Sequence, residues 1–378
     1  MAHFRAFRKD AFVSILFNET FKYRNLYTAY RKSLKSDGKY KPEALIFQRN
    51  ESVNLMRLQR SLYDRTYNFS GYHTFKVYEP KERIINAPHY KDKIVQLALH
   101  ETITDIFIPK FINHSYACMT DRGTHAAVNQ VHKNLKVAKY KWGNNAYICN
   151  VDVRKFFYSI DRDILKEQYR KVIKEEDILW VMDTIVDSGG LIDEKGLPLG
   201  NTLSQLCANV VLNDLDQYCK RYLGYKHYVR YADDVVIVLP NKEEAQRAKE
   251  LCMAFLVERL NLEANKWKSQ IYPINQGINA FGYKIFTTHR LLRDDSKKKI
   301  KRKIKKMPRL IALGRMTIEK ANEMLASWTG HAKHANSYNF IQSIVQRRPY
   351  IKYENGNLMI NKEELNCYIE TMKQTNGN

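Results

Sequence analysis

The stretch HYVRYADDVVIVLP, residues 227–240, places two adjacent carboxylates, Asp233 and Asp234, between two runs of β-branched and aromatic residues. Such runs predict two buried strands, and a two-residue turn between them would put both carboxylates at the tip of a β-hairpin. Neighbouring anions at that tip repel each other and lose hydration, so they require a compensating cation. The stretch therefore indicates a candidate metal site.

A third carboxylate, Asp152, lies near the end of the apolar strand predicted at residues 146–153 and precedes the aromatic pair Phe156 and Phe157. If that strand lies beside the hairpin in one sheet, Asp152 and Asp233 converge. Oxygen-rich clusters of this kind select hard cations such as Mg²⁺. Two such ions about 3.5–4 Å apart serve in-line phosphoryl transfer, so the pattern indicates a polymerase or a nuclease.

The charge of the chain supports a polyanionic partner. Its 378 residues include 63 Lys and Arg against 40 Asp and Glu, a formal net charge of +23. So large an excess creates a positive field, and nucleic acid is the commonest partner for it. A basic protein without such a partner is the alternative at this point.

Length and cysteine usage narrow the class further. The chain is long enough for two or three domains with a sizeable core. Its six cysteines form no CxxC pair and show no zinc-ligand spacing, which predicts free thiols in a reducing compartment. No signal peptide and no apolar run of membrane-spanning length is evident, so we expect a cytoplasmic protein without a membrane partner. The scattered histidines carry no motif, and we assign them no chemistry.

The order of the predicted elements indicates an α+β fold. Residues 11–70 show mostly helical periodicity, 72–88 a β-hairpin, and 91–111 a helix ending near Pro109. Asp161 is a suitable N-cap for the next helix, and LPLG at 197–200 breaks the chain. A long helix, the quoted hairpin, another helix and a strand pair around IYPI and AFGYKIF follow. Because helices alternate with hairpins, we expect a sheet with helices on one face.

A basic helix is predicted at residues 293–309. This stretch, RDDSKKKIKRKIKKMPR, holds ten Lys and Arg in seventeen residues, and Ile300, Ile304 and Met307 recur in it at helical spacing. The alternative is a merely solvated run of charge. The density of the run favours a helix that packs by a thin apolar stripe and contacts phosphates. The residues expected to bind nucleic acid are Lys297, Lys298, Lys301, Arg302 and Lys305.

Several motifs together resemble the reverse transcriptase family over residues 25–345, and they occur in the family's order. VDVRKFF (151–157) and YADD (231–234) resemble motifs A and C, and LPLGNTLSQ (197–205) resembles motif B. FKVYEPKERII (75–85) resembles the fingers hairpin, and SYACMTDRGTHAAV (115–128) the block that follows it. LEANKWKSQI (262–271) and FGYKIF (281–286) resemble motifs D and E. The resemblance implies an RNA-directed DNA polymerase.

Motif B departs from the common family pattern. Leu199-Gly200 replaces the usual Gln-Gly, and Ser204-Gln205 replaces Ser-Pro. This form is similar to reverse transcriptases of diversity-generating retroelements, which copy RNA into cDNA and misincorporate opposite template adenines. Gln can hydrogen-bond near the nascent base pair and Leu cannot, so a mismatched pair would lose less when it is displaced. Drift at one position in a group II intron or other bacterial enzyme is the alternative.

The resemblance implies roles for single residues. Asp152 and Asp233 would bind two Mg²⁺ ions, for which Mn²⁺ could substitute, with Asp234 as a supporting ligand and the Val153 backbone beside them. Phe157 matches the aromatic gate against a ribose 2′-OH, while Phe156 packs in the core. The other expected residues are Lys76 and Arg83 as triphosphate clamps, Leu199, Gly200 and Gln205 in motif B, and Lys268, with Lys266 as its rival, as proton donor to pyrophosphate.

The resemblance also implies a right-hand polymerase with fingers, palm and thumb. We expect N-terminal helices and fingers at 1–148, and a palm made of an antiparallel sheet backed by helices at 149–288. A helical fingers insertion is expected around 161–198, and a helical thumb with a C-terminal tail at 289–378. The implied partners are an RNA template, a DNA or RNA primer, dNTPs, a retroelement RNA and a small basic accessory variability protein.

Two alternative assignments within the family remain open. The first alternative is a group II intron, retron or defence-type reverse transcriptase; the absence of a maturase-like extension after the predicted thumb argues against a full intron protein. The second is a non-catalytic RNA-binding relative, against which the three intact carboxylates argue.

Overall fold

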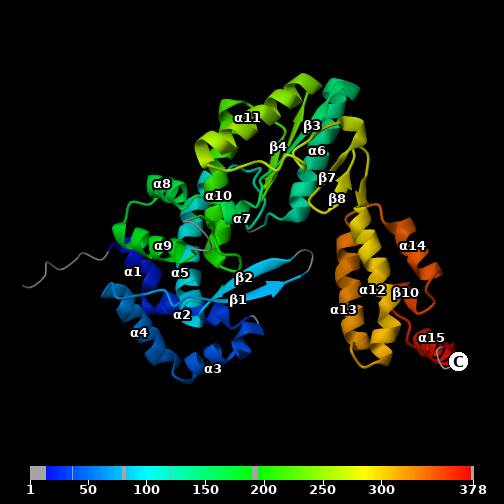
Figure 1. Ribbon diagram of the computed structural model, residues 1–378, viewed down its shortest axis with the longest axis horizontal. Helices are drawn as coiled ribbons and strands as arrows, with labels where there is room; N and C mark the ends of the chain where they lie inside the picture. The colour runs from blue at the N-terminus through cyan, green and yellow to red at the C-terminus, as the bar shows by residue number, and fades with distance from the viewer. Residues whose placement is uncertain (1–13, 36, 79–81, 120, 190–194, 376–378) are drawn as a thin grey trace, which may run out of the picture. The chain divides into compact units, whose positions relative to one another are not determined.

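A computed structural model of the chain describes residues 14–35, 37–78, 82–119, 121–189 and 195–375 (Figure 1). The described residues divide into two compact units. Unit 1 takes its residues from 1–121, 151–235 and 248–269, and unit 2 from 122–150, 236–247 and 270–378. These units differ from the expected division into fingers, palm and thumb, whose boundaries therefore stay a prediction.

Unit 1 contains the N-terminal helices and the first hairpin, as the sequence predicts. The helices are α1 (Ile15–Phe21), α2 (Tyr23–Ser33), α3 (Pro42–Arg49), α4 (Glu51–Tyr63) and α5 (Tyr90–Phe107). Strands β1 (Tyr72–Val77) and β2 (Arg83–Pro88) pair in antiparallel register, with Lys76 opposite Ile84. Residues 79–81, where the Glu-Pro-Lys turn is predicted, lie outside the described residues.

The remaining elements of unit 1 lie between the two acidic motifs in the sequence. Its elements are α7 (Phe156–Ser159), α8 (Arg162–Val172), α9 (Glu176–Asp187), α10 (Thr202–Gln217) and β4 (Tyr228–Tyr231). The predicted N-cap at Asp161 is confirmed, since its carboxylate accepts hydrogen bonds from the amides of Asp163 and Ile164. Helix α10 buries mostly apolar side chains, together with Ser204, Asn209 and Asp216, and it packs beside α5 and α8 in the core of this unit.

The sheet that carries the acidic motifs has the strand order β4-β5-β3-β6. Strands β3 (Tyr147–Asp152) and β5 (Asp234–Leu239), like helix α11 (Lys242–Leu260), contribute residues to both units. Every residue of β5 after Asp234 is buried, which explains its unbroken apolar run. In this strand order β3 lies next to β5, as the predicted convergence of the carboxylates requires.

The predicted strand pair around IYPI and AFGYKIF is wrong. Strand β6 (Ile271–Pro273) pairs instead with residues 147–149 of β3. The second segment forms part of a separate three-stranded sheet of β7 (Ile278–Ala280), β8 (Tyr283–Ile285) and β9 (Arg290–Leu292). Gly277 separates the two groups of strands in a left-handed conformation (φ 65°). A side chain there would meet the Ile285 carbonyl at 2.6 Å, so the close approach of backbones requires glycine.

Unit 2 combines this small sheet with α6 (Thr124–Trp142) and a C-terminal helical part. Its helices are α12 (Asp294–Ala312), α13 (Ile318–Ala332), α14 (Tyr338–Gln346) and α15 (Lys362–Thr375). Strands β10 (Ile351–Glu354) and β11 (Asn357–Ile360) form a hairpin, and β11 packs on α13. The segment after 345, in which the sequence shows no motif, is thus a folded hairpin and helix that pack on this helical part.

Two further expectations concern cysteines and membranes. All six cysteines are free thiols, as predicted. Among the helices of the described residues, none has both the length and the apolar character that crossing a bilayer requires.

Candidate active site

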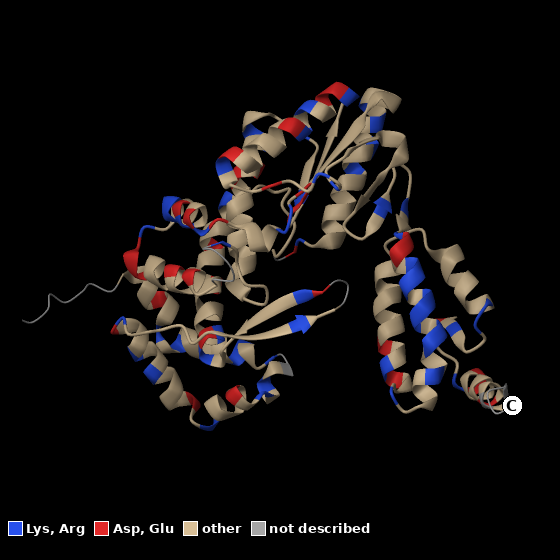
Figure 2. Cartoon of the chain, in the orientation of Figure 1, with Lys and Arg blue, Asp and Glu red and all other residues tan. Residues whose placement is uncertain are grey.

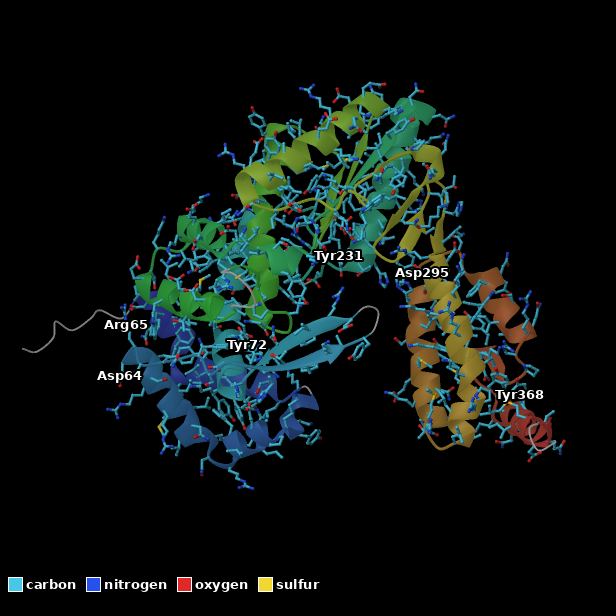
Figure 3. All side chains as sticks on the ribbon, viewed as in Figure 1. Asp64, Arg65, Tyr72, Tyr231, Asp295 and Tyr368 are labelled. Atoms are coloured by element: carbon cyan, nitrogen blue, oxygen red, sulfur yellow. The ribbon has the colours of Figure 1, made fainter. Side chains whose placement is uncertain are left out.

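The acidic hairpin differs from the prediction at its tip. Strand β4 ends at Tyr231, which Figure 3 labels, and β5 begins at Asp234. The turn therefore consists of Ala232 and Asp233, with Ala232 in the left-handed region (φ 53°). Only Asp233 lies in the turn, while Asp234 is the first residue of the buried strand. A left-handed alanine is costly, so the surrounding structure must hold this turn in place.

A fully buried arginine holds the turn. Arg230, which has no exposed surface, donates to the Ala232 carbonyl at 3.0 Å and to the Asn209 side chain at 3.0 Å. Its guanidinium also forms a two-point ion pair with Asp216 of α10, at 2.8 and 2.7 Å. Tyr228 donates to the same carboxylate at 2.6 Å. The network fixes the backbone immediately before Asp233 to the core helix α10.

Asp152 is positioned by the segment that resembles motif D. The Asp152 amide donates to the hydroxyl of Ser269 at 3.1 Å, and the Asn265 amide donates to the Asp152 carbonyl at 2.7 Å. This pairing carries Lys268 to the acidic side chain, where its ammonium lies 2.6 Å from the Asp152 carboxylate. Lys268 thus contacts Asp152, and the choice between Lys268 and Lys266 as proton donor stays a prediction.

The three carboxylates are close enough for the charge of one to raise the pKa of another. Burial, then the charges of Asp233 and Asp152, raise the pKa of Asp234 to about 7. Burial is also the largest cause that raises the pKa of Asp233, and the Asp152 charge adds to it. Carboxylates that raise one another's pKa in a buried site lack a full counter-charge. Strands β3 and β5 are neighbours in one sheet, so their ends bring Asp152 near Asp234 as the sequence predicts, while the roles of these residues stay a prediction.

The chemistry of the donors fits divalent metal ions. Carboxylate and backbone oxygens are the ligands of Mg²⁺, and a doubly charged ion would compensate both the burial and the mutual repulsion that raise these pKa values. Asp152, Asp233 and Asp234 would hold such ions, which when bound supply Lewis acidity for phosphoryl transfer. The Lys268 ammonium supplies part of that positive charge at Asp152 in this structure.

A cavity of about 1290 Å³ lies in front of the carboxylates and is lined by residues of unit 1 alone. Asp152 and Asp233 line it, together with other expected site residues from four separate stretches of chain. These residues are Arg83 from β2, Val153 and Phe157 after β3, Leu199 from motif B, and Lys268 with its neighbour Lys266. The cavity thus gathers most of the predicted site.

Other predicted residues lie differently. Lys76 is exposed and forms an ion pair with Glu82 at 2.8 Å, so its ammonium is engaged by a neighbour on the hairpin. Gln205 is exposed on α10 and is absent from the residues that line the cavity. Phe156 is buried, as expected for a core residue, and its ring meets that of Phe157 edge to face at 5.6 Å.

Gly200 shows why motif B keeps its glycine. Its φ is 103°, and a side chain there would meet Ile85 at 2.7 Å and the Asn86 carbonyl at 3.1 Å. The Asn86 amide donates to the Leu199 carbonyl at 2.7 Å, which ties this loop to strand β2. Any other residue at 200 would separate the loop from β2, so glycine sets the position of Leu199 at the cavity.

The basic helix α12 has two distinct faces. Ile300, Ile304 and Met307 are buried, as the sequence predicts. Figure 2 shows Lys and Arg running along the helix, and Lys298, Lys301, Arg302 and Lys305 share the opposite, exposed face by helical spacing. Lys297 is only half exposed and pairs with Asp294 at 3.2 Å, while Lys301 lies over the ring of Phe340 at 5.0 Å.

Changing Lys298, Lys301 and Lys305 together to glutamine should weaken the salt dependence of RNA binding. Each phosphate contact adds roughly 0.7–0.9 to the slope of log K against log salt, so the slope should fall by about 2–3. The matched control changes three exposed residues of α11, Lys242, Arg247 and Arg259, to glutamine. Equal slopes for the wild type and the α12 variant would show that this helix does not contact phosphates.

Comparison with known proteins identifies the family. The model of the family "Reverse transcriptase (RNA-dependent DNA polymerase)" matches residues 76–285, more than half of the chain. This stretch includes all three carboxylates and every residue of the cavity. The chain therefore belongs to the reverse transcriptase family, and its enzyme class is that of an RNA-directed DNA polymerase.

Individual relatives are distant. Protein YkfC of Escherichia coli is 26% identical over 296 residues, which cover 67% of this chain and 73% of YkfC. The group II intron-encoded protein LtrA of Lactococcus lactis is 24% identical over 273 residues, covering 54% of this chain but 44% of LtrA. Among solved structures, a telomerase from Candida albicans in complex with a telomeric RNA fragment matches with a TM-score of 0.46 and 11% identity, over 74% of this chain and 55% of that one.

The sequence analysis assigned no role to the residues that support the acidic side chains, although some of them lie within the quoted motifs. Arg230, Asp216, Asn209 and Ser269 touch the backbone or the partners of the acidic residues, but none belongs to the chemistry itself. One signal could have found the first pair: a buried arginine in an apolar strand needs an anion, and Asp216 is an acidic residue within the apolar helix just before it.

Proposed function

We propose that this chain copies RNA into DNA by two-metal phosphoryl transfer. The observation that carries the proposal is that Asp152 and Asp233 line one cavity with Arg83 and Phe157, while Asp234 follows Asp233 on the strand next to β3. In this assignment the three carboxylates hold Mg²⁺ or Mn²⁺, Arg83 and Lys76 bind the triphosphate, and Phe157 excludes the ribose 2′-OH. The net charge of +23 serves the template and primer.

Lys268 acts as the proton donor in this proposal. Its ion pair with Asp152 raises its pKa against the opposing effect of burial, so it is protonated at neutral pH. A protonated amine at the site can supply the proton that the leaving pyrophosphate takes up. A metal ion held by Asp152 would compete with the Lys268 ammonium for that carboxylate, and Lys268 also lines the cavity.

We infer further that the enzyme belongs to a diversity-generating retroelement and makes errors opposite template adenines. The support is Leu199, which lines the cavity in place of the usual glutamine, together with Gly200 and Gln205 in the motif. An apolar side chain at this place cannot hold the nascent base pair by a hydrogen bond. A retroelement RNA and a small basic accessory protein would be the partners.

The group II intron class is the second candidate. Its support is the likeness to LtrA, a group II intron-encoded protein. A near-repeat beside the gene whose copies differ only at adenines favours the retroelement, and a flanking intron RNA favours the second candidate. A non-catalytic relative is the third candidate, and the primer-extension assay distinguishes it from both.

Leu199→Gln should lower the error frequency opposite template adenine several-fold, because glutamine restores a hydrogen bond near the base pair. The measurement is deep sequencing of cDNA made on a defined RNA template. Leu199→Met, which keeps an apolar side chain of similar size, is the control and should keep the wild-type spectrum. An unchanged spectrum in the glutamine variant would contradict the role given to Leu199. A wild type that is accurate at adenines would contradict the retroelement assignment and leave the polymerase assignment standing.

A further inference from the structure

Two imidazoles and a carboxylate meet at the base of the first hairpin, in unit 1 and apart from the acidic motifs. His73 Nε2 and His89 Nδ1 each lie 2.6 Å from the same oxygen of Glu43, Oε1. The imidazole rings are 4.2 Å apart between centroids. One ligating atom from each of the three residues lies within 4.8 Å of the others, and no other set of three among the described residues meets this spacing.

Three separate elements bring these side chains together. Glu43 lies in the first turn of α3, His73 on strand β1, and His89 immediately before the first residue of α5. The second oxygen of Glu43 accepts the Tyr90 amide at 3.1 Å, which fixes the orientation of the carboxylate. Burial alone would raise the pKa of Glu43, but hydrogen bonds from His73, the Tyr90 amide and His89 outweigh it and lower that pKa. The group therefore presents an ionised carboxylate and two imidazole nitrogens to one point.

We propose that Glu43, His73 and His89 bind a divalent transition-metal ion of the zinc class, with water in the remaining position. Imidazole nitrogen combined with one carboxylate favours such ions, whereas the all-oxygen acidic site favours Mg²⁺. The ligands of a tetrahedral zinc ion are about 3.3 Å apart, given bond lengths near 2.0–2.1 Å. The two nitrogens need to withdraw from Oε1 by less than about 1 Å to reach that geometry. All three side chains are partly exposed and can make this movement.

The site would connect α3 to both ends of the β1–β2 hairpin. His73 lies opposite Ala87 in the strand register, and Ala87 comes two residues before His89. An ion bound by the three side chains would therefore link the open end of the hairpin to helices α3 and α5. The hairpin carries Lys76 and Arg83 farther along its strands. The metal site stands on its own geometry, and only its effect on these two residues rests on the proposed function. The ion is structural in this proposal, since no carboxylate of the acidic motifs belongs to it.

Zinc binding is measured on the full chain carrying Asp233→Asn and Asp234→Asn together with Cys118→Ser and Cys367→Ser. These changes remove the acidic site and the exposed thiols as competing zinc sites. We expect one Zn²⁺ per chain by competition with a chelating dye. Glu43→Gln, His73→Gln and His89→Gln should each weaken binding at least about tenfold, since loss of even an outer partner of a metal site costs 10–100-fold. The matched control is His100→Gln. His100 lies on α5, the helix that begins directly after His89, and it is not one of the three proposed ligands.

A second measurement does not depend on how the variants fold. Zn²⁺ should protect His73 and His89 of the wild-type chain from diethylpyrocarbonate, as mapped by mass spectrometry, while Mg²⁺ should not. Equal zinc affinity in all three ligand variants, or unchanged modification of both histidines in saturating Zn²⁺, would overturn the proposal and leave two hydrogen bonds to Glu43 as the whole role of these imidazoles. Because both readouts ignore polymerisation, they fail or succeed independently of the proposed activity.

Discussion

Replacing Asp233 and Asp234 together by asparagine is expected to abolish primer extension on an RNA template, with a loss of at least about 10³-fold. Metal ions supply several kcal/mol of transition-state stabilisation, and each 1.36 kcal/mol is tenfold in rate. Asparagine keeps the size of the side chain but removes the negative charge that would hold the ions. The measurement is the rate of primer extension with an RNA template, a DNA primer, dNTPs and Mg²⁺.

The control is a carboxylate of the same cavity that has no part in the acidic cluster. Glu263 lines the cavity and forms an exposed ion pair with Arg154 at 2.9 Å. Such surface pairs contribute little, so Glu263→Gln should extend primers at close to the wild-type rate. A double asparagine variant that is as active as the wild type would show that metal binding does not reside at Asp233 and Asp234.

Acidity gives a second test of the same assignment. The pKa of Asp234 is raised to about 7, so this carboxyl takes up a proton as the pH falls below that value. Metal ions and protons then compete for it, and the Mg²⁺ concentration for half-maximal activity should rise as the pH falls from 8 to 6. The pKa of Asp234 is higher in the folded protein than in the unfolded chain, so without metal its ionised carboxylate lowers the free energy of unfolding above pH 7. This destabilisation disappears as the pH falls from about 7 toward the ordinary pKa of an aspartate.

Arg230→Met is expected to destabilise the protein by about 3–5 kcal/mol, the cost of removing one partner of a buried ion pair. The charged carboxylate of Asp216 would remain fully buried, and within the network only Tyr228 would still donate a hydrogen bond to it. The Ala232 carbonyl would also lose its donor, so the turn that presents Asp233 would lose its support. The measurements are the free energy of unfolding in urea and the rate of primer extension.

The double variant Arg230→Met, Asp216→Leu separates stability from positioning. Replacing both charges of a buried pair by apolar groups is often neutral, so most of the lost stability should return, apart from the part due to Tyr228 losing its acceptor. The extension rate should stay low, because methionine cannot donate to the Ala232 carbonyl. A double variant that recovers both stability and activity would show that Arg230 does not position the turn.

The motifs predicted which residues lie near one another, because the family pattern places particular side chains at particular positions along the chain. Asp152, Asp233, Phe157, Leu199 and Lys268 all line one cavity. Local patterns also gave the helices, the first hairpin and the N-cap at Asp161, since capping and periodicity depend on residues a few positions apart.

Pairing between distant segments was predicted less well. Strand β6 joins β3 rather than the next strand in sequence, because short apolar strands fit several partners and only the assembled sheet chooses among them. The turn was placed one residue too late, since the buried environment of Asp234 and the hydrogen bond from Arg230 decide where the strand begins.

The sequence by itself determined the class of enzyme, because the acidic residues and the motifs around them follow the family pattern in its order along the chain. The tertiary structure decided which lysine contacts Asp152, which arginine supports Asp233, and that Glu43, His73 and His89 meet. The contacts of Lys268 with Asp152 and of Glu43 with His73 and His89 join residues 30 to 116 positions apart, and no local pattern encodes them. Only when the buried charges are brought together does each one acquire the partner that its burial requires.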